Sequence, residues 1–210
     1  MNHRILQLAP AALLIWFCGC AGTSIKQTWK SPDYHGGPVQ KVAVLAMDER
    51  GIVRVALENR YVRDLRERGQ PALACGELVD LAEIKTNKEA VTARLREAGA
   101  DTILAVQLVD RISYNSQASG APSLYGRDLY LYAGTWYDNF SYHSVQRAGV
   151  RSSTKREFYL DNSLFDLGSG QRLWSGLALL VLKEGDAPLD AADALSGKIV
   201  TALYKDGLIH

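Results

Sequence analysis

The fold is decided by residues 41–69, which read KVAVLAMDERGIVRVALENRYVRDLRERG. Residues 41–48 form a short apolar run bounded by turn signals, which is typical of a buried strand. Over residues 52–68, apolar side chains recur every four positions, which predicts an amphipathic helix. The other face of this helix carries charged side chains spaced for i,i+4 ion pairs, among them Arg54 and Glu58, and we expect that face to meet solvent.

Gly69 predicts the end of that helix, and the alternation of strand and helix continues beyond it. Residues 71–78 predict a second strand, and residues 86–89 match a capping box that begins a helix ending at Gly99. Residues 101–113 then begin as a third apolar strand. This order predicts an α/β fold in which helices cover a sheet in a three-layer-like arrangement; an α+β arrangement stays open.

The second half of the chain has a different character. Residues 114–127 are rich in Ser, Gly, Asn and Pro and predict a long loop, whereas residues 128–150 are rich in aromatic side chains. Two long runs follow, joined by Gly-Ser-Gly at residues 168–170, which predicts an antiparallel β-hairpin over residues 156–183. The pattern over residues 188–206 predicts a C-terminal amphipathic helix.

The N-terminus has the composition of a bacterial secretory signal. His3 and Arg4 form a short basic start, residues 5–17 are largely apolar, and small residues follow. A membrane-spanning helix is the alternative, but the apolar stretch is shorter than the roughly 20 residues that cross a bilayer. Residues 1–19 are therefore interpreted as a signal peptide.

The end of this leader reads Phe17-Cys18-Gly19-Cys20. It resembles the bacterial lipobox, in which a small residue precedes a cysteine that is acylated before cleavage. The resemblance implies that Cys20 begins the mature chain and carries the lipid; Cys18 is a poor candidate because bulky Phe17 precedes it. Two or more acyl chains give stable anchoring to a membrane. In the family's sorting pattern, Ala21 after the cysteine favours the outer membrane.

The residues after the leader are polar and rich in glycine and proline. Residues 20–38 therefore predict a lipidated tether that leads into a single periplasmic domain over residues 39–210. With Cys18 removed and Cys20 lipidated, Cys75 has no partner for an internal disulfide. Its apolar surroundings predict a buried, unreactive thiol.

Several short motifs occur in a definite order after the leader. They are Thr28-Trp29-Lys30-Ser31-Pro32-Asp33-Tyr34, Gly36, Lys41-Val42-Ala43-Val44-Leu45, Arg54, Glu58, Gly69 and Gly99-Ala100-Asp101. This order is similar to that of a group of uncharacterised bacterial outer-membrane lipoproteins, which begin with Trp-x-x-Pro-x-Tyr, a glycine and a Lys-Val-x-Val-Leu strand. More loosely, residues 166–176 resemble a hairpin of periplasmic α/β lipoprotein domains of the curli-secretion and penicillin-binding-protein-activator kind. That second likeness concerns the fold alone.

Charge and motif content argue against several classes of function. The chain of 210 residues carries 24 Lys and Arg against 23 Asp and Glu and has no dense basic block, so no nucleic-acid partner is expected. The histidines that remain after the leader are isolated, so no metal site is predicted. No phosphate-binding or nucleophile-elbow motif occurs, so no cofactor is predicted. Residues 152–155 match S-x-x-K, but the partner motifs of penicillin-recognising enzymes are missing.

The aromatic-rich region has two interpretations, and both stay open. Aromatic residues are common in strands, so they fit a sheet core. They also dominate protein interfaces, so they fit a surface that binds an envelope protein, a glycan or a lipid headgroup. The candidate partner-binding residues are Tyr125, Tyr132, Trp136, Tyr137 and Tyr142.

The sequence supports three hypotheses about function. The leading one is a lipid-anchored periplasmic lipoprotein of the outer membrane that binds or scaffolds an envelope component without catalysing a reaction. The second is an envelope hydrolase whose site is assembled from distant residues, and the third is a subunit of an oligomeric secretion or assembly complex. No motif identifies the ligand.

Overall fold

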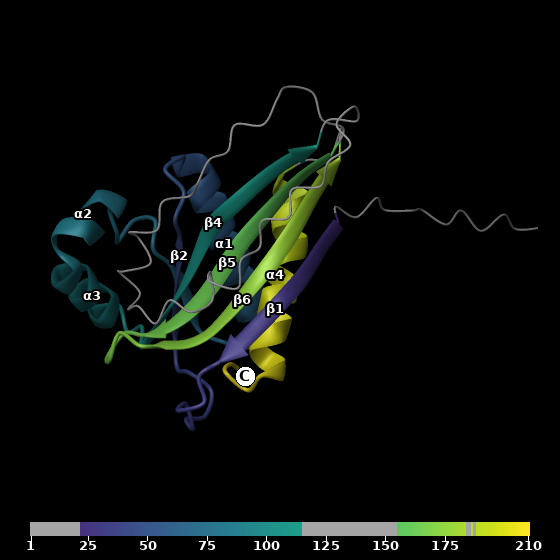
Figure 1. Ribbon diagram of the computed structural model, residues 1–210. Helices are drawn as coiled ribbons and strands as arrows, with labels where there is room; N and C mark the ends of the chain where they lie inside the picture. Colours follow the sequence, from purple (N-terminus) through teal and green to yellow (C-terminus); the bar gives the residue numbers. More distant parts are fainter. Residues whose placement is uncertain (1–21, 115–154, 184–185, 187) are drawn as a thin grey trace, which may run out of the picture.

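Parallel and antiparallel strands share one six-stranded sheet in the computed structural model, which describes residues 22–114, 155–183, 186 and 188–210 (Figure 1). The strands are β1 (Gly22–Lys30), β2 (Val42–Ala46), β3 (Ala72–Ala74), β4 (Thr102–Tyr114), β5 (Lys155–Asp166) and β6 (Arg172–Lys183). They lie in the order β1-β6-β5-β4-β2-β3. The helices are α1 (Gly51–Glu67), α2 (Leu81–Thr86), α3 (Lys88–Glu97) and α4 (Pro188–Lys205). The predicted α/β class is confirmed.

Strand β2 lies in the parallel part of the sheet, between β3 and β4. Val42 pairs with Ala72 on one side and with Thr102 on the other. All five residues of β2 are at most 1% exposed, and a strand buried on both faces reads as a continuous apolar run. β3 is shorter than the strand predicted over residues 71–78 because a turn begins at Cys75.

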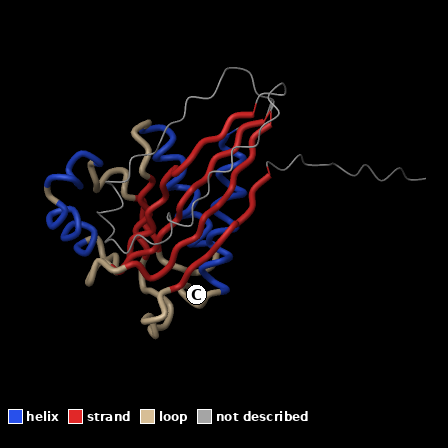
Figure 2. The backbone as a smooth tube through the Cα atoms, in the orientation of Figure 1, coloured by secondary structure: helices blue, strands red, loops and turns tan. Residues whose placement is uncertain are grey.

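Helices cover both faces of this part of the sheet (Figure 1 and Figure 2). Val42 and Val44 belong to the core cluster shared with α1 and α4. Ala43 and Leu45 belong to the cluster on the other face, which contains residues of α3. Successive side chains of a strand point to opposite faces, so β2 joins both layers of helices to one sheet. The predicted three-layer-like arrangement is present here.

Two of the predicted helix ends are confirmed by backbone geometry. Gly69 follows α1 with φ of 81°, and Gly99 follows α3 with φ of 84°. Both values lie in the left-handed region, which side chains other than glycine rarely adopt. The predicted C-terminal helix is α4, and the predicted third strand is β4.

The antiparallel part of the sheet contains the predicted hairpin, formed by β5 and β6. At its turn, the Asp166 carboxylate accepts hydrogen bonds from the Ser169 backbone N–H at 2.5 Å and from its hydroxyl at 2.7 Å. Gly170 completes the turn with φ of 73°. The Asx-type bonds from Asp166 stabilise the turn, so the Gly-Ser-Gly signal is confirmed.

A buried polar contact fixes α1 on the antiparallel strands. The Tyr61 hydroxyl donates a hydrogen bond to Asn162 Oδ1 at 2.6 Å, and both residues are 0% exposed. Asn162 Nδ2 donates to the carbonyl oxygens of Leu160 and Gly176, each at 3.2 Å. Buried polar groups are stable when they are hydrogen-bonded, so this contact sets the position of α1 over β5 and β6.

The expected tether at residues 20–38 is wrong for residues 22–30, which form β1. This strand pairs antiparallel with β6, starting with Gly22 opposite Val181. As the edge strand of the sheet it leaves most of its side chains exposed, so its sequence is as polar as that of a linker. Polar composition does not distinguish an edge strand from a tether.

The helix predicted to begin within residues 86–89 is preceded by another helix. Thr86 is the last residue of α2, and α3 begins after Asn87, whose side chain makes no capping hydrogen bond. The capping side chain is Asp80, which accepts a hydrogen bond from the Ala82 N–H at 2.9 Å and begins α2. The capping-box prediction is wrong because helical structure starts before that motif.

Gly176→Ala should strongly destabilise the fold. The indole ring of Trp174 is fully buried and lies over Gly176, so that a Cβ at residue 176 would be 2.3 Å from Cη2 of the ring. We expect the free energy of unfolding to fall by about 1–3 kcal/mol or more, because the ring has to move within a packed core. Urea unfolding measures the change.

Gly37→Ala is the matched control, because no atom lies within 4 Å of its Cβ position. Equal unfolding midpoints for the Gly37 and Gly176 variants would contradict the predicted clash.

Candidate functional site

One end of the sheet begins two residues along the chain from the predicted lipid attachment. Cys20 is outside the described residues, but β1 begins at Gly22. Because β1, β6, β5 and β4 are successively antiparallel, β1 begins near the end of the sheet where β4 finishes. β2 runs in the same direction as β4 but ends at Ala46, opposite Val106, and leads from there towards α1. We call this side of the domain the anchor end: Gly22 and the end of β6 at Lys183 belong to it, and residues 51–55 of α1 lie on the same side, across the sheet from β1 (Figure 1).

Helix α4 holds β1 in place near the anchor end. The Lys198 ammonium donates a hydrogen bond to the Thr23 carbonyl oxygen. Ile25 packs against the core cluster that contains Leu195 and Ile199 of α4. The strand that follows the predicted anchor is therefore attached to the domain by its contacts with α4 as well as by pairing with β6.

A buried ion pair lies under the loop between β2 and α1. Arg54 Nε donates to Glu58 Oε1 at 2.9 Å, and the same oxygen accepts from the Ala46 N–H at 3.1 Å. Arg54 Nη2 donates to the carbonyl oxygens of Cys75 at 3.4 Å and Val79 at 2.8 Å. The pair joins α1 to the end of β2 and to the turn after β3.

The expectation that Arg54 and Glu58 face solvent is wrong. Glu58 is 0% exposed and Arg54 is 8% exposed. Their four-residue spacing identifies the pair, but the rotation of α1 about its axis decides whether the pair is buried. Burial raises the pKa of the Glu58 carboxyl above its usual value, while hydrogen bonding and attraction from Arg54 act in the opposite direction.

A second ion pair closes the loop that precedes α1. Arg50 donates Nε to Asp48 Oδ1 at 2.9 Å and Nη2 to Asp48 Oδ2 at 2.7 Å. The pKa of the Asp48 carboxyl is lowered, chiefly by these side-chain hydrogen bonds from Arg50. The two charges neutralise each other at the anchor end.

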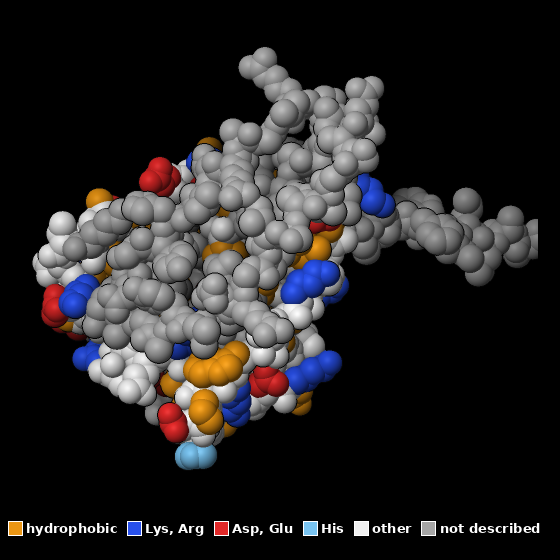
Figure 3. All heavy atoms as spheres, in the orientation of Figure 1, with side chains coloured by type: hydrophobic (Ala, Val, Ile, Leu, Met, Phe, Trp, Pro, Cys, Tyr) orange, Lys and Arg blue, Asp and Glu red, His pale blue; other side chains and the backbone are white. Residues whose placement is uncertain are grey.

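Charged side chains of both signs are interspersed on the described surface seen in Figure 3. This matches the near balance of 24 basic and 23 acidic residues in the chain. The described side chains visible in this view therefore form no large field of one sign that would select an acidic or a basic partner.

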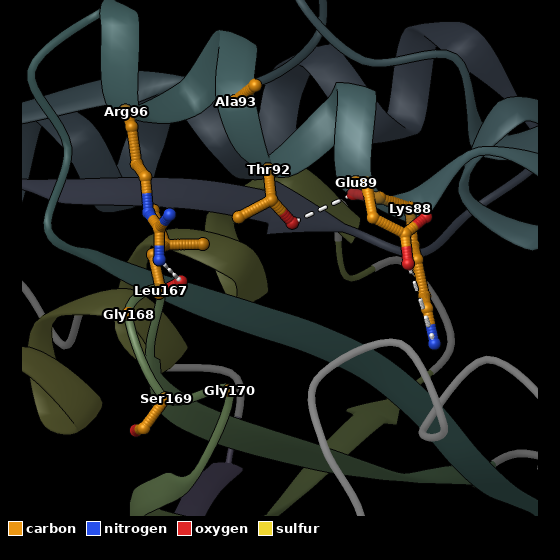
Figure 4. Close-up of a pocket in the computed structure, with 9 residues that line it drawn as sticks. All are labelled: Lys88, Glu89, Thr92, Ala93, Arg96, Leu167, Gly168, Ser169 and Gly170. Atoms are coloured by element: carbon orange, nitrogen blue, oxygen red, sulfur yellow. Dashed lines mark hydrogen bonds and ion pairs between the residues drawn. The ribbon is translucent and has the colours of Figure 1, made fainter.

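An open hollow of about 300 Å³, with a lining of mixed polarity, lies at the opposite end of the sheet, between α3 and the β5–β6 turn (Figure 4). Its lining consists of Lys88, Glu89, Thr92, Ala93, Arg96, Leu167, Gly168, Ser169 and Gly170. The Arg96 guanidinium donates a hydrogen bond to the Leu167 carbonyl oxygen. The Thr92 hydroxyl donates to the Lys88 carbonyl oxygen at 2.8 Å. Arg96 thus connects α3 to the end of β5, which gives this polar side chain a structural role.

The prediction of a buried thiol is confirmed. Cys75 is 0% exposed and lies in the cluster under α3. Burial is the main reason that the pKa of its thiol is raised far above the usual value. The protonated thiol is a poor nucleophile, so Cys75 has the properties of a core residue.

The other residues singled out from the sequence lie outside the described part of the chain. They are Cys20 and the aromatic candidates Tyr125, Tyr132, Trp136, Tyr137 and Tyr142. Within the described residues, no three His, Cys, Asp or Glu side chains gather where they could hold a metal ion. The helices in those same ranges are too short or too polar to cross a membrane.

Comparison with known proteins identifies no family: no family model and no curated protein matches the chain. Among solved structures, the PelC dodecamer from Paraburkholderia phytofirmans is 11% identical and has a TM-score of 0.47, covering 90% of this chain and 100% of the PelC chain. A substituted PelC dodecamer from the same organism is 10% identical with a TM-score of 0.48, covering 86% and 96%. Lipoprotein GNA1162 from Neisseria meningitidis is 15% identical with a TM-score of 0.37, covering 80% and 96%.

Removing one partner of the buried ion pair should destabilise the fold. Glu58→Ala leaves the Arg54 guanidinium buried without its carboxylate, which is expected to lower the free energy of unfolding by about 3–5 kcal/mol. Replacing both residues by methionine removes both charges, so we expect part of the loss to be restored. Urea unfolding followed by circular dichroism measures all three proteins.

Arg63→Ala is the matched control on the same helix. Arg63 pairs with Asp193 at 2.9 Å at the surface, where an ion pair contributes about 0–1 kcal/mol. A loss for Glu58→Ala no larger than that for Arg63→Ala would show that the buried pair does not stabilise the domain.

Proposed function

We propose that this protein is a lipoprotein of the bacterial outer membrane, anchored through Cys20, whose periplasmic domain binds an envelope component without catalysing a reaction. The observation that carries the proposal is the junction of leader and domain. A signal-like leader ends in Gly19-Cys20, and β1 begins two residues later at Gly22. The resemblance of the leader to the lipobox assigns the lipid to Cys20, and Ala21 favours the outer membrane.

The short junction supports a domain held close to the lipid surface. Two residues reach at most about 7 Å, so Gly22 is kept near the headgroups once Cys20 is acylated. β1 is in turn fixed to β6 and to α4, as Val181 and Lys198 show. The anchor would therefore hold the folded domain itself, with the anchor end of the sheet towards the membrane.

The roles of the polar side chains support binding over catalysis. Arg54 and Glu58 join secondary-structure elements, and Arg96 holds the β5–β6 turn against α3. Each of these groups has a structural function in the fold. The partner-binding role stays with the aromatic residues predicted from the sequence, which suit an envelope protein or a glycan as the ligand.

Cys20→Ala should release the protein from the membrane fraction while the domain stays folded. Without the thioether and amine acylation the chain loses its stable attachment. Fractionation of cells into soluble, inner-membrane and outer-membrane material measures the distribution, and the mass of the N-terminal peptide reports the lipid directly.

Cys18→Ala is the matched control, because that cysteine is expected to leave with the signal peptide. Ala21→Asp should move the protein towards the inner membrane if the family's sorting pattern applies. A Cys20→Ala protein that remains in the outer-membrane fraction at the wild-type level would disprove the anchor.

Binding through the aromatic residues is tested by crosslinking in the native envelope. We expect Trp136→Ala together with Tyr137→Ala to reduce the yield of a specific crosslinked complex several-fold without changing membrane attachment. Tyr204→Ala is the control, because Tyr204 is an exposed tyrosine of α4. An unchanged yield for the double variant would remove these two residues from the binding surface.

A further inference from the structure

Four large apolar side chains of the described residues are exposed: Trp29 at 41%, Ile52 at 88%, Val55 at 50% and Tyr204 at 53%. The two aromatic ones have a basic neighbour over the ring. Arg172 lies 5.9 Å from the ring centre of Trp29, and Arg68 lies 5.5 Å from that of Tyr204. The two aliphatic ones differ, because a side chain of Ile or Val has no polar group that water can solvate.

Ile52 and Val55 form a small apolar surface at the beginning of α1. They are three residues apart, so they lie on the same side of the helix. Further along α1, Tyr61, Val62 and Leu65 are buried in the core. The apolar side chains in the second half of α1 are therefore buried in the core. Ile52 and Val55, in its first turns, are exposed to solvent.

This apolar surface lies at the anchor end. β1 and β2 are separated in the sheet by β6, β5 and β4, which is four strand spacings of about 4.8 Å, or roughly 19 Å. β1 begins opposite Val181 of β6, which is level with Ile112 of β4, whereas β2 ends opposite Val106, six residues further back along β4. α1 follows β2 after a short loop. Gly22 and the start of α1 therefore lie on the same side of the domain, the upper side in Figure 1, separated across the width of the sheet and offset along the strands.

We propose that Ile52 and Val55 enter the surface of the bilayer that holds the Cys20 anchor, giving the domain a second contact with the membrane. The inference rests on the proposed function, because the anchor brings this end of the domain to the lipid. Transfer of exposed aliphatic side chains from water to an apolar environment is favourable. An anchor at one point leaves a domain free to tilt, and a second contact across the width of the sheet fixes its orientation.

The charges beside this surface specify the kind of contact. Arg50 is engaged by Asp48, and Glu49 is exposed next to them. The loop before α1 therefore has no excess positive charge with which to attract anionic headgroups. The contact is apolar, and we expect it to be insensitive to salt, unlike the binding of a basic patch to lipid.

The experiment places an environment-sensitive NBD fluorophore on a cysteine at residue 52 of the full-length, lipidated protein. The protein is reconstituted into vesicles of phosphatidylethanolamine and phosphatidylglycerol, with and without brominated acyl chains. Ile52→Cys is mild, because the side chain is 88% exposed. Cys75 is fully buried and does not compete for the label. Tyr204→Cys is the matched control, on the last turns of α4, the helix whose other end is at the anchor end.

We expect NBD at residue 52 to show a blue-shifted emission and to be quenched by the brominated chains several-fold more strongly than NBD at residue 204. Both effects should persist at high salt.

Equal spectra and equal quenching at the two positions, in protein that floats with the vesicles, would overturn the second contact while leaving the anchor intact. A blue shift at residue 52 without bromine quenching, growing with the protein-to-lipid ratio, would also overturn it by assigning the surface to a second copy of the chain. Failure of the wild-type protein to float with the vesicles would overturn the anchor, and the second contact with it.

Discussion

Strand β2 is enclosed on every side, and the arrangement of the other elements depends on this. β3 and β4 pair with its two edges, α1 and α4 pack with Val42 and Val44, and α3 packs with Ala43 and Leu45. A strand with apolar side chains on both faces has to be covered on both, so helices are required on each side of the sheet. Parallel pairing with β3 and β4 then requires crossover connections, which α1 and the α2–α3 segment provide.

The antiparallel strands extend the sheet from its parallel part to the edge strand β1. β5 and β6 extend the sheet beyond β4, and β1 completes it at the edge. Each reversal of direction returns the chain to the opposite end, so β1 begins on the side of the domain towards which β2 and β4 run, and on which α1 begins. The proposed lipid on Cys20 would therefore determine more than attachment to a membrane. It would determine which side of the domain approaches the lipid, because the strand that follows is part of the folded domain.

Polar groups inside the domain are used to hold loops and helix positions. Glu58 joins α1 to the end of β2, Arg54 joins it to the turn after β3, and Tyr61 joins it to β5 through Asn162. Placing charged or polar groups in a core is costly unless every partner is in place, so each such contact disfavours alternative positions of the helix. Buried polar contacts thus fix the position of α1 on the sheet. The apolar side chains of its first turns, Ile52 and Val55, are exposed.

The amino-acid sequence by itself determined the α/β class, the hairpin at residues 168–170 and the burial of Cys75, and it predicts the leader with its candidate lipid cysteine. These features depend on local signals: apolar periodicity, glycine in the left-handed conformation and turn chemistry. Only the tertiary structure decided that residues 22–30 are a strand, because an edge strand is defined by its neighbour β6 and not by its own composition. It also decided that Arg54 and Glu58 are buried and Ile52 is exposed, because periodicity identifies the faces of a helix but not the rotation that brings one of them against the sheet.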